Sequence, residues 1–222
     1  MTRVKICCIS SAEEARLAMS LGATALGFVS EMPSGPGVIS DALIAELVAS
    51  LEAPVDTFLL TSRRDAGSII EQQRRAGVNT LQLCDAVSLD ALSQIRGTLP
   101  DVSLVQVIHV IDQQSVEEAM AIAPAVDGLL LDSGNPSLPV KELGGTGRTH
   151  DWSLSAEIVR SAPVPVYLAG GLKPGNVGEA ISAVRPFGVD LCTGVRTDDQ
   201  LDEQKLRAFM QSVGAAMPSI SP

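Results

Sequence analysis

Residues 3–22, "RVKICCISSAEEARLAMSLG", contain one complete strand–helix unit. The first seven residues form a short apolar run of the kind that becomes a buried strand. The stretch after it has apolar residues at helical spacing, with Ser11 as a favourable N-cap and Gly22 where helices commonly end. This order predicts a parallel strand covered by its own helix.

The same unit recurs along the chain without a break in composition. Helical stretches follow the apolar runs, with Asp41 as a second N-cap and Gly77 as a second C-terminal glycine. Eight units predict a (β/α)8 TIM barrel of the α/β class, a single domain over residues 1–222 with a loose tail from about residue 214. An open doubly wound sheet is the alternative, although no G-x-G-x-x-G follows the first run. The eight runs are 3–9, 23–29, 55–60, 79–84, 103–110, 127–132, 164–170 and 188–194.

Composition limits the partners. Hydrophobic residues make up 45% of the 222 residues and aromatic residues only 3%, so the core is mostly aliphatic. The net charge of −10 argues against nucleic acid, which needs a basic face, but allows a small anion held by backbone N–H groups. No apolar run is long enough to span a bilayer, and the N-terminus lacks a signal-peptide pattern. We therefore expect a cytoplasmic protein.

The four cysteines, Cys7, Cys8, Cys84 and Cys192, form no C-x-x-C pair. In a reducing compartment they are expected to be free thiols. Since side chains alternate along a strand, Cys7 is expected to face the barrel mouth and Cys8 the layer between strand and helix. A metal site built from cysteines and His109 is disfavoured, because these residues follow no local spacing rule, so we expect no metal.

Three glycine-bearing loops come late in the chain, "LGGTGRTHDW" (143–152), "LAGGLKPGNV" (168–177) and "CTGVRTDD" (192–199). In such barrels the loops after the last strands often bind phosphate through backbone N–H groups. Tight turns alone would explain one loop, but three at neighbouring strand ends favour a phosphate site. The residues predicted to bind it are Gly145, Thr146, Gly147, Gly170, Gly171, Thr193 and Gly194.

These segments, together with "VKICCIS" (4–10), "ALGFV" (25–29), "LLLDS" (129–133) and "GVDLCTGV" (188–195), resemble the phosphoribosylanthranilate isomerase family over nearly the whole chain. The resemblance implies an Amadori rearrangement, the aldose–ketose isomerisation of a phosphoribosyl amine in tryptophan biosynthesis. It implies Cys7 as general base and Asp132 as general acid, no cofactor, and a small phosphorylated sugar amine as partner. It also implies a monomer or weak homodimer.

The residues themselves make physical demands. Cys7 needs thiolate character, which a positive field favours, and Asp132 needs an apolar setting to keep a proton near neutral pH. Lys5 shares strand parity with Cys7 and could support the thiolate or only form a polar layer. The possible substrate-binding residues are Lys5 itself, Cys84, Asp190 and Arg63. His109 could face the ligand, and His150 is expected to be exposed.

The sequence departs from the family pattern where the aromatic acid would bind. In "SEMPSGPGVIS" (30–40), Gly37 stands where the family has an arginine associated with the anthranilate carboxylate. Cys84 and Asp85 replace a His-Gly pair, Cys8 replaces a glycine, and Arg196 replaces a glutamate. Losing a charge-assisted contact predicts weak activity on phosphoribosylanthranilate unless another cation, such as Arg63 or Arg64, reaches the carboxylate.

Three alternatives therefore stay open. The protein could be a paralogue acting on another phosphorylated sugar, or a non-catalytic barrel that binds a phosphorylated ligand. It could also be a Schiff-base aldolase with Lys5 or Lys173 as the amine.

Overall fold

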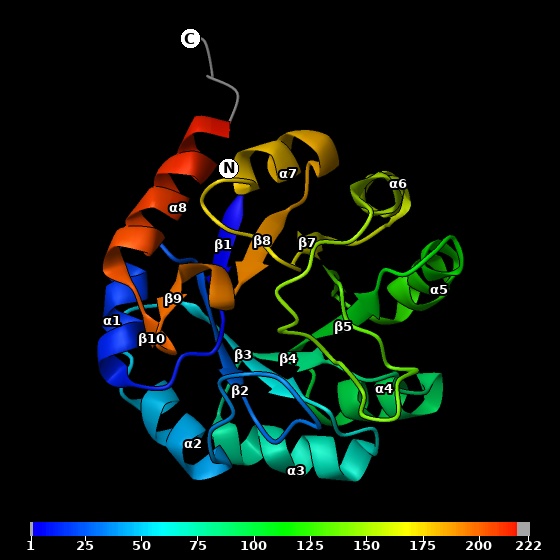
Figure 1. The fold of residues 1–222 in the computed structure, drawn as a ribbon. Helices are drawn as coiled ribbons and strands as arrows, with labels where there is room; N and C mark the ends of the chain where they lie inside the picture. Colours follow the sequence, from blue (N-terminus) through cyan, green and yellow to red (C-terminus); the bar gives the residue numbers. More distant parts are fainter. Residues whose placement is uncertain (1, 217–222) are drawn as a thin grey trace, which may run out of the picture.

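The computed structural model describes residues 2–216, which form the predicted closed (β/α)8 barrel (Figure 1). Eight parallel strands pair in chain order, and the last pairs with the first, with Val4 opposite Val189 and Ile6 opposite Leu191. Closure of the sheet excludes the open doubly wound alternative. The strands are β1 (Arg3–Ile6), β2 (Ala25–Val29), β3 (Asp56–Thr61), β4 (Thr80–Leu83), β5 (Ser103–His109), β6 (Gly128–Asp132), β7 (Val166–Leu168) and β8 (Gly188–Leu191).

A helix follows each strand, and together the helices form the outer ring seen in Figure 1. They are α1 (Ala12–Ser20), α2 (Asp41–Ala49), α3 (Ala66–Ala76), α4 (Leu89–Thr98), α5 (Gln114–Ile122), α6 (Trp152–Ser161), α7 (Val177–Val184) and α8 (Glu203–Ala216). Within residues 2–216, no helix combines the length and apolar character needed to cross a membrane.

The helix ends agree with the sequence except at two places. The Ser11 side chain caps α1 by accepting from the Glu14 N–H, and Gly77 ends α3 in the left-handed conformation. The N-cap of α2 is Ser40, which accepts from the Leu43 N–H, so Asp41 is instead the first helical residue. Residues 214–216, assigned above to the tail, belong to α8; the rest of the predicted tail, 217–222, lies outside the described residues.

Strand alternation separates two apolar clusters. Outward side chains such as Ile6, Leu26 and Leu81 pack under the helices in the larger cluster. Inward side chains such as Phe58, Val105 and Leu130 fill the barrel together with Cys7 and Cys84. Because inward positions beyond this packed layer face the C-terminal mouth, the strand ends carry the chemistry there.

The loop after β8 contains structure that the sequence did not predict. A short 3-10 helix, Thr193–Val195, leads into a two-stranded antiparallel hairpin of β9 (Arg196–Thr197) and β10 (Gln200–Leu201). This hairpin positions Arg196 beside the turn that follows β1.

Candidate active site

A cavity opens at the C-terminal mouth, where the strand ends meet the loops after β2, β6, β7 and β8. It brings together most of the predicted site residues, namely Cys7, Cys84, Asp132, Asp190, Gly145, Thr146, Gly147, Gly170, Gly171 and Thr193. Lys5, Arg63 and Gly194 are not part of its lining. The lining also contains residues that the sequence analysis did not select, including Val29, Met32, Pro36, Leu60 and Gln82.

Cys7 faces into the barrel, as predicted. A Cβ atom at Gly27 on the neighbouring strand would lie 2.9 Å from the Cys7 Sγ atom and 3.1 Å from the Lys5 Nζ atom. The missing side chain at Gly27 therefore makes room for both groups. Burial raises the pKa of the Cys7 thiol to about 11, and the opposing effect of the Lys5 charge only partly offsets this increase.

Lys5 forms a buried ion pair below the cavity. Its Nζ atom lies 2.8 Å from Asp190 Oδ1, and the lysine side chain is fully buried. Burial alone would lower the pKa of Lys5, but the Asp190 carboxylate outweighs it and raises the pKa to about 12. Lys5 is therefore a fixed positive charge close to the Cys7 sulfur.

Asp132 ends β6 beside His109, its partner in the strand register. One carboxylate oxygen, Oδ1, accepts from the Ser133 N–H at 2.7 Å, and Oδ2 lies where a Cβ atom at Gly144 would be only 2.7 Å away. Burial raises the pKa of Asp132, and the Ser133 N–H opposes this shift without cancelling it. A carboxyl group with a raised pKa is suited to donate a proton.

The glycine loops pack closely around the opposite wall of the cavity. A Cβ atom at Gly171 would lie 2.7 Å from the Arg148 carbonyl carbon and 2.8 Å from the Thr149 nitrogen, so a side chain would push the loops apart. The Thr146 and Ser133 hydroxyl oxygens lie 2.7 Å apart and tie the β6 loop to its strand. Gly194 is needed for packing against Leu172, whose carbonyl oxygen would lie 2.0 Å from an added Cβ atom.

Two predictions about cysteine were wrong. Cys8 forms a disulfide with Cys192, with Cα atoms 5.8 Å apart, so these two are not free thiols. Cys8 also lines the mouth rather than the strand–helix layer. The physical reason is that β1 ends at Ile6, and Cys8 adopts a left-handed conformation with φ of 63°, which breaks the alternation of side chains. Cys7 and Cys84 remain free thiols.

Arg196 is a structural residue of the mouth that the sequence did not reveal. Its guanidinium pairs with both oxygens of Glu14, at 2.7 and 3.1 Å, and also donates to the Cys8 carbonyl. Glu14 in turn accepts from the Ser10 N–H. The turn after Cys7 is thus held by a buried charge network, and the signal in the sequence was the arginine at a position where the family has a glutamate.

The departures from the family pattern at the end of β4 have structural explanations. Asp85 pairs with Lys141 from the β6 loop; burial opposes the shift, but the Lys141 contact lowers the pKa of Asp85. Burial raises the pKa of Cys84, which is consistent with a packed thiol. The Arg64 Nε atom donates to the Ala86 carbonyl, and this arginine does not line the cavity.

The histidines do not contribute side chains to this cavity. The His109 Nε2 atom lies 3.1 Å from the Cys84 carbonyl oxygen. The prediction that His150 is exposed was wrong, because its side chain is half-buried. Its Nε2 atom lies 2.7 Å from Ser155 Oγ, and burial lowers its pKa to about 4. In the part of the chain that the structure describes, no three His, Cys, Asp or Glu side chains are grouped to hold a metal ion.

A closed (β/α)8 barrel that places a thiol beside a lysine charge, and a carboxyl group of raised pKa in the same mouth, defines an acid–base enzyme of the TIM-barrel class. The chain belongs to the N-(5'-phosphoribosyl)anthranilate isomerase family, whose model matches residues 4–212.

Known relatives cover nearly the whole chain. It is 35% identical over 215 residues to N-(5'-phosphoribosyl)anthranilate isomerase of Methanocella arvoryzae, covering 96% of this chain and 98% of the relative. It is 33% identical to the Haloferax volcanii enzyme, covering 99% and 96% of the two chains. The structure is similar to phosphoribosylanthranilate isomerase from Thermotoga maritima, with a TM-score of 0.83 and 27% identity over 97% of this chain and 100% of that one.

A second solved structure adds information about ligands. It is a phosphoribosylanthranilate isomerase in complex with reduced 1-(o-carboxyphenylamino)-1-deoxyribulose 5-phosphate. The TM-score is 0.81 at 26% identity, with 97% of this chain and 100% of that chain covered.

Proposed function

We propose that the protein isomerises N-(5'-phosphoribosyl)anthranilate to the corresponding 1-amino-1-deoxyribulose 5-phosphate, a step of tryptophan biosynthesis. Family membership and the activity named for the relatives support this function. The observation in this chain that carries it is the placement of Cys7 and Asp132 in one cavity with the three glycine loops.

The reaction requires one acid and one base. Asp132 protonates the furanose ring oxygen as the ring C–O bond breaks and the amine nitrogen forms the Schiff base. The Cys7 thiolate then removes the proton from the adjacent carbon, which gives an enolamine that tautomerises to the ketone. The Lys5 charge supports the thiolate, and the raised pKa of Asp132 keeps a proton available.

The phosphate is proposed to bind at the loops after β6, β7 and β8. Gly145, Gly147, Gly170 and Gly171 all have positive φ values, so their backbones adopt conformations that side chains disfavour. Such loops can direct several N–H groups at one anion. Thr193 follows Cys192 on the β8 side of the same cavity.

The alternative readings have less support. A Schiff-base aldolase needs a neutral amine, whereas Lys5 has a pKa raised to about 12 and is paired with Asp190. Lys173 is exposed and does not line the cavity. The paralogue alternative concerns only which amine substituent binds at the end of the cavity opposite the glycine loops.

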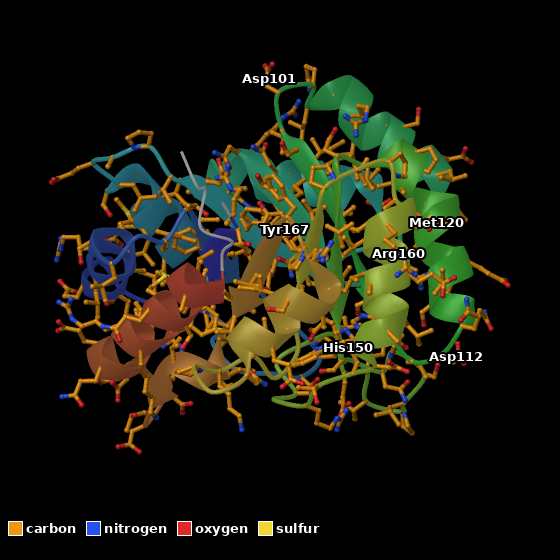
Figure 2. The ribbon with its side chains drawn as sticks, turned by 90° about the horizontal axis from the view of Figure 1, so that it is seen from above. Asp101, Asp112, Met120, His150, Arg160 and Tyr167 are labelled. Carbon is orange, nitrogen blue, oxygen red and sulfur yellow. A yellow bond between two sulfur atoms is a disulfide. The ribbon has the colours of Figure 1, made fainter. Side chains whose placement is uncertain are left out.

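Complementation of a tryptophan auxotroph that lacks the isomerase tests the function in cells. Kinetics on phosphoribosylanthranilate test the roles: Cys7→Ala and Asp132→Asn should each lower kcat by at least about a thousandfold, in the range of lost acid–base catalysis. Asp101→Asn is the matched control, because Asp101 is exposed and Figure 2 shows it at the opposite end of the molecule from Asp112 and His150. Wild-type protein that neither complements nor turns over this substrate would overturn the proposal.

A further inference from the structure

The cavity has an unusual charge pattern for a site that receives an anion. Among its lining residues there is no lysine, arginine or histidine, whereas Asp132 and Asp190 both contribute carboxylates. The glycine loops can hold a phosphate without a cationic side chain. The end opposite those loops is lined by the apolar side chains of Val29, Met32 and Leu60.

Cys8 explains why this end carries no cation on the β2 loop. A Cβ atom at Gly37 would lie 2.5 Å from the Cys8 Cβ atom and 3.0 Å from its Sγ atom. Gly37 also has φ of +78°, a conformation that disfavours side chains. Cys8 cannot easily move aside, because it is bonded to Cys192 and its carbonyl accepts from Arg196. Position 37 is therefore closed to any side chain while Cys8 is present.

Three cations near the mouth are already paired with carboxylates. Lys141 pairs with Asp85, Arg148 with Glu142, and Arg196 with Glu14. Arg63, which follows β3, does not line the cavity, and the described residues offer it no ion-pair partner. A carboxylate at the apolar end would thus lose water without gaining a charge-assisted contact from any residue that lines the cavity.

We propose that Cys8 is a specificity-determining residue. Because it excludes a side-chain cation at position 37, the apolar end of the cavity binds the amine substituent of the substrate equally well with or without a carboxylate. The substrate class is then 5-phosphoribosylamines whose amine carries a flat apolar group, whether or not that group is charged. This inference rests on the proposed function and narrows what the site recognises. The Cys8–Gly37 contact is then the reason that this site has no side-chain cation at position 37, where the family has an arginine.

Two isosteric substrates test the proposal directly. The 5-phosphoribosyl adducts of anthranilate and of anthranilamide differ in charge but hardly in shape. For the wild type we expect kcat/KM values within about threefold of each other, whereas a bound carboxylate would favour anthranilate by about tenfold or more. A tenfold preference for anthranilate in the wild type would overturn the proposal, and loss of that preference in Arg63→Met would assign the carboxylate to Arg63.

Variants test the role of Cys8. Gly37→Arg alone should lower the melting temperature without creating a preference, because the new side chain collides with Cys8. Cys8→Gly combined with Gly37→Arg should favour the anthranilate adduct by about tenfold, and Gly37→Arg should lower the melting temperature less in the Cys8→Gly background, which already lacks the disulfide, than in the wild type. Strictly additive effects of the two substitutions on both quantities would contradict the proposed coupling.

Binding measurements separate this inference from the proposed function. Calorimetry with reduced 1-(o-carboxyphenylamino)-1-deoxyribulose 5-phosphate and its carboxamide counterpart requires no turnover. Equal dissociation constants would support the inference even if neither adduct were isomerised, a result that would overturn only the proposed function. Tighter binding of the carboxylate form by about tenfold would overturn the inference even in an active isomerase.

Discussion

The Nζ atom of Lys5 lies 2.8 Å from the Oδ1 atom of Asp190, within a barrel interior that is otherwise mostly apolar. The two residues face each other across the seam where β1 closes onto β8. The pair therefore links the closure of the fold to the electrostatics of the Cys7 thiol, because the same lysine charge opposes the rise in the pKa of Cys7.

Replacement of Lys5 by methionine should strongly destabilise the protein. The change leaves the Asp190 carboxylate buried without a counter-charge, which typically costs about 3–5 kcal/mol. Urea denaturation measures the free energy of unfolding, and Arg207→Met, which breaks an exposed pair with Glu203, is the control expected to change it little. Lys5→Met combined with Asp190→Leu should recover much of the loss, and no recovery would argue against the pair as the cause.

Alkylation of Cys7 should report its raised pKa. Since the thiolate is the reactive form and the pKa is about 11, the rate with iodoacetamide should rise about tenfold per pH unit from pH 7 to 10. Mass spectrometry of quenched samples measures the rate at each cysteine. Cys84, whose pKa is also raised by burial, serves as the internal comparison and should react more slowly. A rate that levels off near pH 8 would show that Cys7 is an ordinary or activated thiol.

The Cys8–Cys192 disulfide should contribute measurably to stability. It links residues 184 positions apart, and native disulfides typically stabilise by about 3 kcal/mol. Cys8→Ser combined with Cys192→Ser should therefore lower the melting temperature by about 6–12 °C in non-reducing buffer. Reductant should lower the melting temperature of the wild type but not of the double variant. Equal sensitivity of both proteins to reductant would show that another thiol is responsible.

Phosphate binding should depend on Gly171 but not on Gly175 in the same loop. Gly171→Ala places a methyl group against Arg148 and Thr149 at a φ of +60°, whereas an added Cβ atom at Gly175 meets nothing within 4 Å. Calorimetry with ribose 5-phosphate should show at least about tenfold weaker binding for Gly171→Ala and unchanged binding for Gly175→Ala. Circular dichroism checks that both variants are folded. Unchanged affinity in folded Gly171→Ala would move the phosphate to other loops.

The sequence by itself determined the repeated strand–helix units of the barrel and the positions of Cys7, Lys5 and Asp132 on its strands. Eight apolar runs alternating with helical spacing are a local pattern, and strand parity places Cys7 on the inner face of β1 with Lys5. Whether the sheet closes is decided by the pairing of β1 with β8, because an open doubly wound sheet would also bury the apolar faces of its strands. Asp132, at the end of the apolar run of β6, could be placed at the mouth in advance.

Only the tertiary structure decided what surrounds those residues. Local alternation stops where a strand stops, so the sequence could not reveal that Cys8 turns toward Cys192, which lies 184 residues away. The exclusion of a side chain at Gly37 likewise depends on the approach of two loops from different strands. Arg196, which follows β8, forms its ion pair with Glu14 of α1 across the seam where the barrel closes. Contacts between distant segments form only when the sheet closes, and they determine the shape and charge of the apolar end of the cavity.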